Sequence, residues 1–159
     1  MKIADGEENR KIRPWIINFS HFPFYCSDDS NPTCDSHDNS FKKLDDIIHK
    51  YNVDLFINAH VHKYERTYPV YQKRSYWETS KNSTKATGEI YRNPRATIFV
   101  TEGLPGNDKS FDKDYLPKDW SKIVSNIKGY GVLNVINETS LYYERTNSAD
   151  GTIVDNFMI

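Results

Sequence analysis

Two histidines, His60 and His62, stand two residues apart in the segment NAHVHKYER, directly after the apolar run VDLFI. A third, His21, follows another apolar run, and the whole chain has only five histidines. Imidazole is the commonest protein ligand of metals. Residues i and i+2 of an extended segment point the same way, with their Cα atoms roughly 6.5–7 Å apart. That spacing suits two ligands of one metal, or ligands that flank two metals about 3.5–4 Å apart.

The elements that must position these histidines are a strand, a helix and a second strand. The strands are predicted at Trp15–Phe19 and Val53–Ile57. One face of the helix between them carries the apolar residues Phe41, Leu44, Ile48 and Tyr51. This order predicts a parallel β-α-β unit with a right-handed connection. Because the carboxyl ends of parallel strands meet at one sheet edge, His21, His60 and His62 are expected to converge there.

Each histidine taken alone also has an ordinary explanation. A His-x-His pair is common by chance, and a histidine at a strand end is often only a capped polar group. It is the convergence of three imidazoles at one sheet edge that favours a metal site. His49 lies on the helix face away from Phe41 and is assigned no role, and His37, in the loop before the helix, stays undecided from chemistry alone.

The second half of the chain has a different sequence pattern. Four short β-rich runs, RATIFVTEG, GYGVLNVINE, SLYYERTN and TIVDNFMI, are punctuated by Gly, Asn and Asp. This pattern predicts an antiparallel edge or meander. The polar stretch QKRSYWETSKNSTKATGEIYRNP, which precedes these runs, is expected to be a solvated loop.

Both cysteines, Cys26 and Cys34, lie in one loop. The functional alternatives are that the two cysteines bind a metal or form a redox pair. Their spacing does not fit a zinc site, and the sequence contains no second cysteine pair to complete one. A disulfide is the favoured interpretation over two free thiols, and it would stabilise the loop by roughly 2–3 kcal/mol. Disulfides persist in oxidising compartments. N-glycosylation acceptor sequences at Asn82 (NST) and Asn137 (NET) add modest weight to an exported protein.

Length and charge exclude several classes of protein. With 159 residues, the chain is long enough for one ordinary domain, and its net charge of −1 makes nucleic acid a poor partner. No apolar run approaches the roughly 20 residues of a membrane span. The opening MKIADGEENRK has no apolar core of a signal peptide, so an exported protein requires that the chain be part of a longer secreted precursor.

The segments RPWIINFSHFPFYCS and VDLFINAHVHKYERTYPVY closely resemble the two carboxyl-terminal motifs of purple acid phosphatases, within the calcineurin-like metallophosphoesterase superfamily. The animal-type branch, in which a cysteine-bearing loop joins the two motifs, is the most similar. The resemblance extends to the closing segments and so covers nearly the whole chain. It implies an α/β fold, in which residues 1–159 are the carboxyl-terminal part of an α/β/β/α sandwich domain.

The resemblance also implies roles for individual residues. His21 and His60 would bind the divalent ion (Zn, Mn or Fe) of a dinuclear centre, and His62 would bind its Fe(III) partner. His37 is similar to a loop histidine that contacts the substrate phosphate and helps to protonate the leaving group. The pair Glu65-Arg66 continues the motif and is expected to support the metal ligands or the structure. The implied reaction is hydrolysis of phosphate monoesters, with a water activated by the metals.

Departures from the family pattern shape this expectation. Asn18 stands where valine is preferred, and Ala59 stands where glycine is usual, which only a left-handed backbone would forbid. The family motifs Asp-x-Gly, Gly-Asp-x-x-Tyr and Gly-Asn-His-Asp/Glu, which provide the other ligands, do not occur here. The chain is therefore expected to be half of a site, inactive and poorly soluble alone, with the amino-terminal half supplied in the same or a partner chain.

Three hypotheses remain after this comparison. The first is the metal-binding half of an active phosphatase. The second is a non-catalytic relative that serves as a structural or interaction subunit. The third is an unrelated binding domain with a coincidental motif. Aspartate and asparagine motifs upstream of Met1 would favour the enzyme over the non-catalytic relative.

Overall fold

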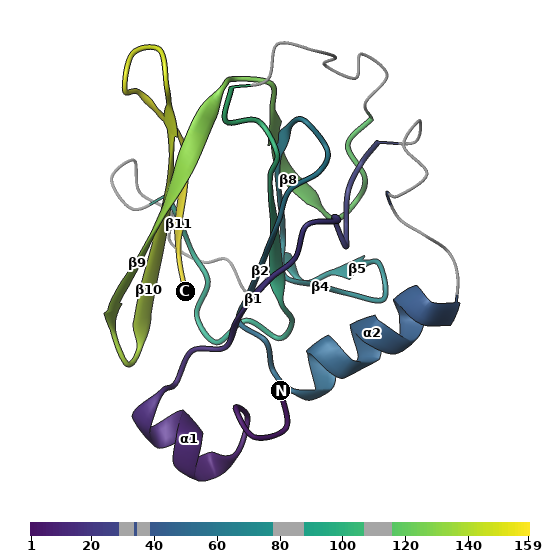
Figure 1. The fold of residues 1–159 in the computed structure, drawn as a ribbon. Coiled ribbons are helices and arrows are strands. Elements are labelled where there is room, and N and C mark those ends of the chain that lie inside the picture. Colours follow the sequence, from purple (N-terminus) through teal and green to yellow (C-terminus); the bar gives the residue numbers. More distant parts are fainter. Residues whose placement is uncertain (29–33, 35–38, 78–87, 107–115) are drawn as a thin grey trace.

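Two β-sheets pack face to face, and one helix covers the outer face of the first sheet (Figure 1). This computed structural model describes residues 1–28, 34, 39–77, 88–106 and 116–159. The covering helix is α2 (Asn39–Lys50), and the short helix α1 (Glu7–Ile12) lies beyond one end of the sandwich. Within these ranges no helix covers the outer face of the second sheet, and none is long and apolar enough to span a membrane.

The first sheet contains the predicted β-α-β unit. Its strand order is β1-β2-β7-β3-β8, and β1 pairs in parallel with β2 on either side of helix α2 in the chain. Strand β2 pairs in parallel with β7, whereas β3 is antiparallel to both β7 and β8. The bounds are β1 Ile17–Phe19, β2 Leu55–Asn58, β7 Ile98–Glu102, β3 Tyr64–Thr67 and β8 Ser121–Ser125.

The second sheet is mostly the predicted antiparallel meander. Strands β9, β10 and β11 pair in sequence, and the two-residue strand β6 adds in parallel to β11. The bounds are β6 Glu89–Ile90, β9 Gly129–Asn137, β10 Ser140–Asn147 and β11 Ile153–Met158. A small hairpin, β4 (Val70–Tyr71) and β5 (Arg74–Ser75), lies beside the first sheet. The polar stretch expected to be a loop thus contains β5 and β6.

One strand lies elsewhere than predicted. The run RATIFVTEG was expected at an antiparallel edge, but its strand β7 sits in the middle of the first sheet, parallel to β2. Ile98 and Val100 face the second sheet, while Phe99 belongs to the core beneath helix α2. A strand that is covered on both faces has a continuous apolar sequence, which is typical of parallel sheets.

The core has two layers, one on each face of the first sheet. The layer beneath helix α2 is largely aromatic, with Phe24 stacked 4.2 Å from Phe41 and 5.3 Å from Phe99. The layer between the sheets contains Leu55, Ile98, Val100, Leu141 and Phe157 among its buried members. Successive residues of β2 alternate between the layers, since Leu55 enters the second and Phe56 the first.

The buried face of helix α2 differs from the predicted one. Leu44 is 40% exposed, whereas Asp45 is only 2% exposed. The Asp45 carboxylate accepts hydrogen bonds from the Tyr25 hydroxyl (2.8 Å) and the Gln72 backbone N–H (2.7 Å), and burial raises the pKa of this group. The helix therefore turns Phe41, Asp45 and Ile48 inward, because the hairpin turn after β4 requires an acceptor there. His49, to which no role was assigned, stacks on Tyr71 with ring centroids 3.8 Å apart.

Two buried arginines connect the sheets in opposite directions. Arg66, on β3 of the first sheet, donates to Asp155 on β11 through Nε (2.6 Å) and NH2 (2.9 Å). Arg145, on β10 of the second sheet, lies 3.3 Å from the Glu102 carboxylate at the end of β7. Further donors complete these clusters, namely Tyr64 and Tyr143, whose hydroxyls reach Asp155 and Glu102. Burial raises the pKa of both tyrosines.

Candidate metal site

His21 and His60 meet at the carboxyl edge of the first sheet. His21 follows β1 and His60 follows β2, and hydrogen bonds from Ser20 N to Ile57 O (3.0 Å) and from Ala59 N to His21 O (3.0 Å) extend the pairing past the strand ends. The His60 Nδ1 and His21 Nε2 atoms are 3.1 Å apart. The predicted convergence of these two residues is therefore present.

The separation of the two nitrogens permits either a hydrogen bond or a shared metal ion. Two nitrogens at about 2.0–2.1 Å from one zinc ion in tetrahedral geometry lie roughly 3.3–3.4 Å apart, close to the observed value. When one ring carries a proton on the facing nitrogen, the same contact is a hydrogen bond. Neutral imidazole nitrogens suit zinc, iron and manganese ions, so the donor set fits the ion that the resemblance implies.

The segment between His60 and His62 is not extended, contrary to the expectation from the sequence. The Val61 N–H donates to Ala59 O (2.7 Å), and the Lys63 N–H donates to Val61 O (2.8 Å), which makes two successive three-residue turns centred on the histidines. His60 has a φ of 61°, in the left-handed region that costs a non-glycine residue of order 1–3 kcal/mol. The two side chains are therefore not related by the two-residue repeat of a strand.

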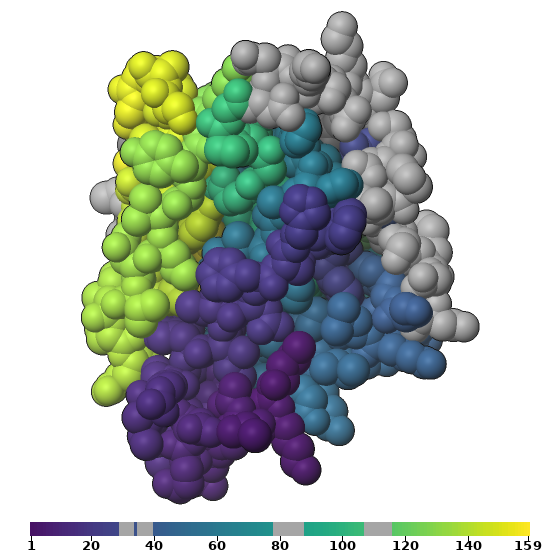
Figure 2. All heavy atoms as spheres, viewed as in Figure 1, coloured from purple at the N-terminus to yellow at the C-terminus, as the bar shows by residue number. Residues whose placement is uncertain are grey.

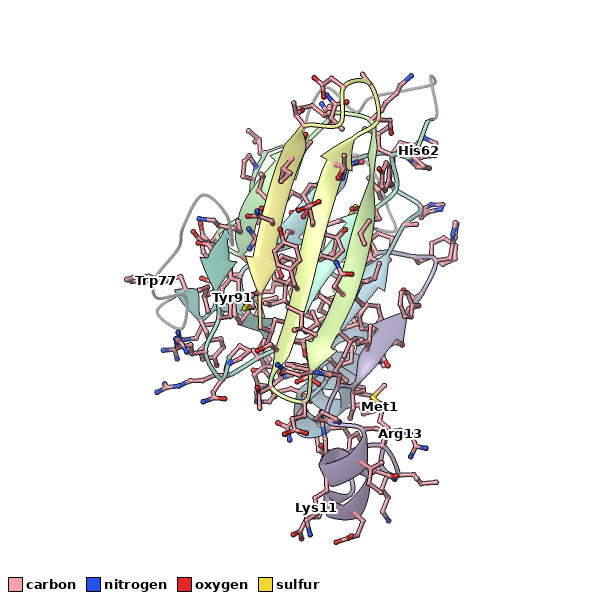
Figure 3. All side chains as sticks on the ribbon, turned by 90° about the vertical axis from the view of Figure 1, so that its left-hand side faces the viewer. Met1, Lys11, Arg13, His62, Trp77 and Tyr91 are labelled. Carbon is pink, nitrogen blue, oxygen red and sulfur yellow. A yellow bond between two sulfur atoms is a disulfide. The ribbon has the colours of Figure 1, made fainter. Side chains whose placement is uncertain are left out.

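His62 consequently stands apart from the other two histidines. Across the described parts of the chain, no three His, Cys, Asp or Glu side chains form a group that could hold a metal ion. His62 is half-buried and lies at the upper end of the sandwich (Figure 3). Its assignment as the ligand of a second ion stays a prediction. Ala59 is absent from the positive-φ residues, so alanine fits where the family prefers glycine.

Aromatic and glycine residues shape the surroundings of the histidine pair. The Phe22 ring lies 4.6 Å from His60 and 5.1 Å from His21, measured between ring centroids, and Phe22 is 56% exposed. A Cβ atom on Gly103 would come within 1.7 Å of the Val61 carbonyl oxygen. Glycine is required there because the end of β7 passes directly against the turn between the histidines. Gly103 was not among the predicted site residues, although its place at the end of the VTEG run was a usable signal.

The carboxylate nearest this edge in the first sheet is already engaged. Glu102 ends β7, accepts a hydrogen bond from Tyr143 and pairs with Arg145. Burial raises the pKa of Glu102. Asn58, at the end of β2, is 2% exposed, and its Oδ1 accepts from the Thr101 hydroxyl at 2.7 Å. These polar groups support the strand ends and do not reach out as further ligands.

The remaining predicted site residues have mixed outcomes. Cys26 and Cys34 form a disulfide with their Cα atoms 5.3 Å apart, which confirms that prediction. His37 and Asn82 lie outside the described residues. Asn137 is exposed at the turn between β9 and β10, where its Oδ1 accepts from the Thr139 N–H at 2.8 Å.

A cavity of about 730 Å³ lies at the other end of the sheet. Its walls include Asn52–Asp54 and Ala96–Thr97, which precede β2 and β7, together with Trp15, Tyr91 and Arg95. His21, His60 and His62 take no part in it. Figure 3 shows His62 at the upper end of the sandwich and Tyr91 well below it. The histidine pair therefore lies at an open edge and not in this cavity.

Comparisons with known proteins find phosphatases, with a family model over part of the chain and relatives over nearly all of it. A family model described as iron/zinc purple acid phosphatase-like protein C matches residues 96–156. Acid phosphatase type 7 of Danio rerio is 34% identical over 171 residues, with 98% of this chain and 37% of the relative covered. Acid phosphatase type 7 of Homo sapiens is 31% identical, with 99% of this chain and 36% of the relative covered. A relative from Arabidopsis thaliana, 29% identical over 95% of this chain and 24% of its own length, is named "Probable inactive purple acid phosphatase 27".

A solved structure has the same fold. Purple acid phosphatase PPD1 from yellow lupin (Lupinus luteus) seeds matches with a TM-score of 0.79 and 28% identity. The match covers 99% of this chain and 27% of the lupin chain. The mixed sheets and the helix on one face are thus those of part of a metallophosphoesterase sandwich. The chain spans about 37% of the length of the first relative.

Proposed function

We propose that residues 1–159, which are similar to purple acid phosphatases over nearly their whole length, form the carboxyl-terminal part of a phosphatase domain and supply histidine ligands to its metal centre. The observation that carries the proposal is the 3.1 Å approach of His60 Nδ1 to His21 Nε2 at the carboxyl edge of a parallel sheet. Ligand sites of open α/β sheets lie at this edge.

The proposed centre is dinuclear, with Fe(III) beside a divalent Zn, Mn or Fe ion. His21 and His60 would hold the divalent ion through the two facing nitrogens, and His62 would be the ligand from this chain to the ferric ion. When bound, such a pair of ions supplies charge to clamp a phosphate and lowers the pKa of a water. Both imidazoles must be neutral at the ligating nitrogen, so acid weakens the site.

The proposed substrate is a phosphate monoester. His37, in the segment that follows the disulfide-closed loop, would contact the phosphate and donate a proton to the leaving oxygen. The Phe22 ring lies against both imidazoles of the histidine pair. The identity of the alcohol released is set by parts of the domain beyond these residues.

The missing ligands would come from an amino-terminal half, in the same chain or a partner chain. Two sheet edges support this proposal, namely β1 in the first sheet and β9 in the second. The two edges lie side by side (Figure 2), where the Trp15 indole N–H donates to the Asn137 backbone oxygen at 2.9 Å. Exposed apolar side chains follow both edges: Phe19, Phe22, Val132, Val135 and Ile136. Further strands that pair there would cover them.

The proposed compartment is extracellular or the lumen of the secretory pathway. The disulfide between Cys26 and Cys34 supports an oxidising environment. Asn137 is exposed at a turn, as an N-glycosylation site requires, and Asn82 is proposed on its sequence alone. A signal sequence is then expected upstream in the longer precursor.

The proposal is tested with the longest natural form of the protein, loaded with iron and zinc. We expect release of phosphate from p-nitrophenyl phosphate, and a loss of at least about 100-fold in His21→Ala and His60→Ala, because the removal of a metal ligand removes the ion. His49→Ala is the matched control, since His49 stacks on Tyr71 away from the site and its loss should leave activity intact. Turnover that survives both ligand substitutions would contradict the proposal.

A second candidate is a non-catalytic relative that acts as a structural or interaction subunit. The relative named as a probable inactive phosphatase favours it. In that case the longest natural form would fold, and its β1 and β9 edges would be covered, but it would release no phosphate with any metal. The same assay therefore separates the two functions.

A further inference from the structure

The buried carboxylate of Glu65 binds the loop that begins at Cys26, whereas Asp155 and Glu102 bind arginines of the opposite sheet. Glu65 lies on β3 and its side chain has no exposed surface. Its Oε2 atom accepts from the Ser27 backbone N–H at 2.8 Å, and its Oε1 atom accepts from the hydroxyls of Ser27 and of Ser121, the latter at 2.7 Å. The Lys63 ammonium lies 3.1 Å from Oε2.

These bonds join three separate segments of the chain. Glu65 and Lys63 belong to the segment after the histidines, Ser121 begins β8, and Ser27 follows Cys26 directly. The Ser27 and Ser121 hydroxyls are also 2.6 Å from each other. Ser27 is fully buried although it belongs to no helix or strand, so its backbone N–H needs this acceptor.

The position of Glu65 links the loop to the metal site. It lies three residues after His62, on the strand into which the two turns of the histidine segment lead directly. Cys26, held next to Ser27, is the first cysteine of the disulfide-closed loop. One carboxylate therefore fixes the start of this loop against the same backbone that positions His60 and His62.

A purely structural explanation of Glu65 would be the neutralisation of Lys63. Two partly buried carboxylates with ion-pair partners have a different arrangement, which argues against that as its whole role. Asp155 and Glu102 each join one sheet to the other through an arginine. Glu65 instead accepts from three neutral donors, two of them from Ser27 and the third from Ser121.

We propose that Glu65 is a positioning residue that holds the beginning of the disulfide loop in place beside the histidine segment. The catalytic meaning of this role rests on the proposed function, in which residues after the loop contact the phosphate. The holding itself is a property of the folded chain, so it is measurable without activity.

The first test measures how fast the disulfide is reduced. The chain has only two cysteines, so alkylation of new thiols under native conditions reports on this bond alone. In Glu65→Gln, we expect reduction by dithiothreitol to become about tenfold faster or more, because hydrogen bonds to a charged acceptor are among the strongest in proteins. Glu102→Gln is the control, since it alters a partly buried carboxylate that pairs with Arg145 and not with Ser27, and it should keep the wild-type rate.

Two further variants keep the test decisive if Glu65→Gln fails to fold. Ser27→Ala and Ser121→Ala each remove one hydroxyl donor and leave the carboxylate in place. Each should increase the reduction rate, by less than Glu65→Gln does. Wild-type reduction rates in both serine variants would overturn the proposal, and so would equal acceleration in Glu102→Gln.

The second test uses the longest natural form and p-nitrophenyl phosphate. Glu65→Gln should raise KM several-fold while its metal content stays at the wild-type level, because the loop is displaced and the histidines are not. Loss of metal with an unchanged KM would contradict a positioning role for the loop. If the wild type itself releases no phosphate, the proposed function fails, and the disulfide measurement still decides the role of Glu65.

Discussion

The space between the two sheets and the open edge with the histidines use polar groups in opposite ways. Between the sheets, Arg66 and Arg145 are almost completely buried, and each is bound to a carboxylate of the opposite sheet. At the edge, His21 is exposed, His60 adopts a left-handed φ, and the two rings contact each other and Phe22.

This difference distinguishes charged groups that stabilise the fold from the histidines that are proposed to bind a metal. The shifted pKa values of Glu102, Tyr91 and Tyr143 all belong to the interior network, where burial is the largest cause. A search for perturbed groups alone would select this interior as a site, since such shifts often mark active sites. The interior groups instead bind one another through hydrogen bonds and ion pairs, whereas a metal ion held by His21 and His60 would require further ligands.

The largest effect should come from breaking the interior network. Arg66→Ala removes the arginine that pairs with Asp155 and Glu89, and it leaves the largely buried Asp155 carboxylate without its cation. We expect the free energy of unfolding to fall by about 3–5 kcal/mol, the usual cost of an uncompensated buried charge. Urea unfolding followed by tryptophan fluorescence measures this loss. Lys11→Ala, which removes only exposed ion pairs of helix α1, should change stability little; an equal loss in both variants would contradict the comparison.

A smaller effect is expected at the edge, where the disulfide supplies the support. Cys26→Ser combined with Cys34→Ser should lower the free energy of unfolding by roughly 2–3 kcal/mol through the entropy of the opened loop. The far-ultraviolet circular dichroism should stay that of the wild type, because the sheets do not depend on the bond. Wild-type protein measured with and without dithiothreitol provides the control. Identical stability under both conditions would show that the bond gives the edge no support.

The smallest effect is a dependence on pH that originates in the interior. Burial raises the pKa of Glu102, and a carboxyl group with a raised folded-state pKa loses stabilising free energy as the pH rises through that value. Glutamine does not ionise. The wild type should therefore lose unfolding free energy relative to Glu102→Gln as the pH rises above the ordinary pKa of a glutamate. Parallel stability curves over this range would mean that Glu102 has the same pKa in both states.

The sequence predicted the β-α-β unit, the meander and the disulfide because each depends on local patterns. Apolar runs of strand length, helical spacing and two cysteines in one loop contain this information directly. The buried face of helix α2 could not be predicted in the same way. Asp45 is buried because the Tyr25 hydroxyl and the Gln72 backbone N–H bind it. No pattern within the helix sequence predicts those partners.

The histidine segment shows the same limit at the site itself. Strand ends placed His21 and His60 correctly, because the parallel pairing of β1 and β2 determines where they meet. His62 was expected to point the same way as His60, but two tight turns interrupt the strand period. Gly103, 42 residues after Val61, leaves room for this arrangement, and the local sequence does not encode that contact.

The central claim is that this chain carries one incomplete set of metal ligands, and zinc binding by residues 1–159 alone tests it most directly. Neutral imidazoles cannot offset the repulsion between two cations, and no group of three ligands forms among the described residues. Equilibrium dialysis should find no more than one weakly bound ion per chain, lost in His21→Ala and in His60→Ala and retained in His49→Ala. The protein should be colourless with iron and should release no phosphate above background. Two tightly bound ions with robust phosphate release by this chain alone, or zinc binding unchanged by both substitutions, would contradict the account.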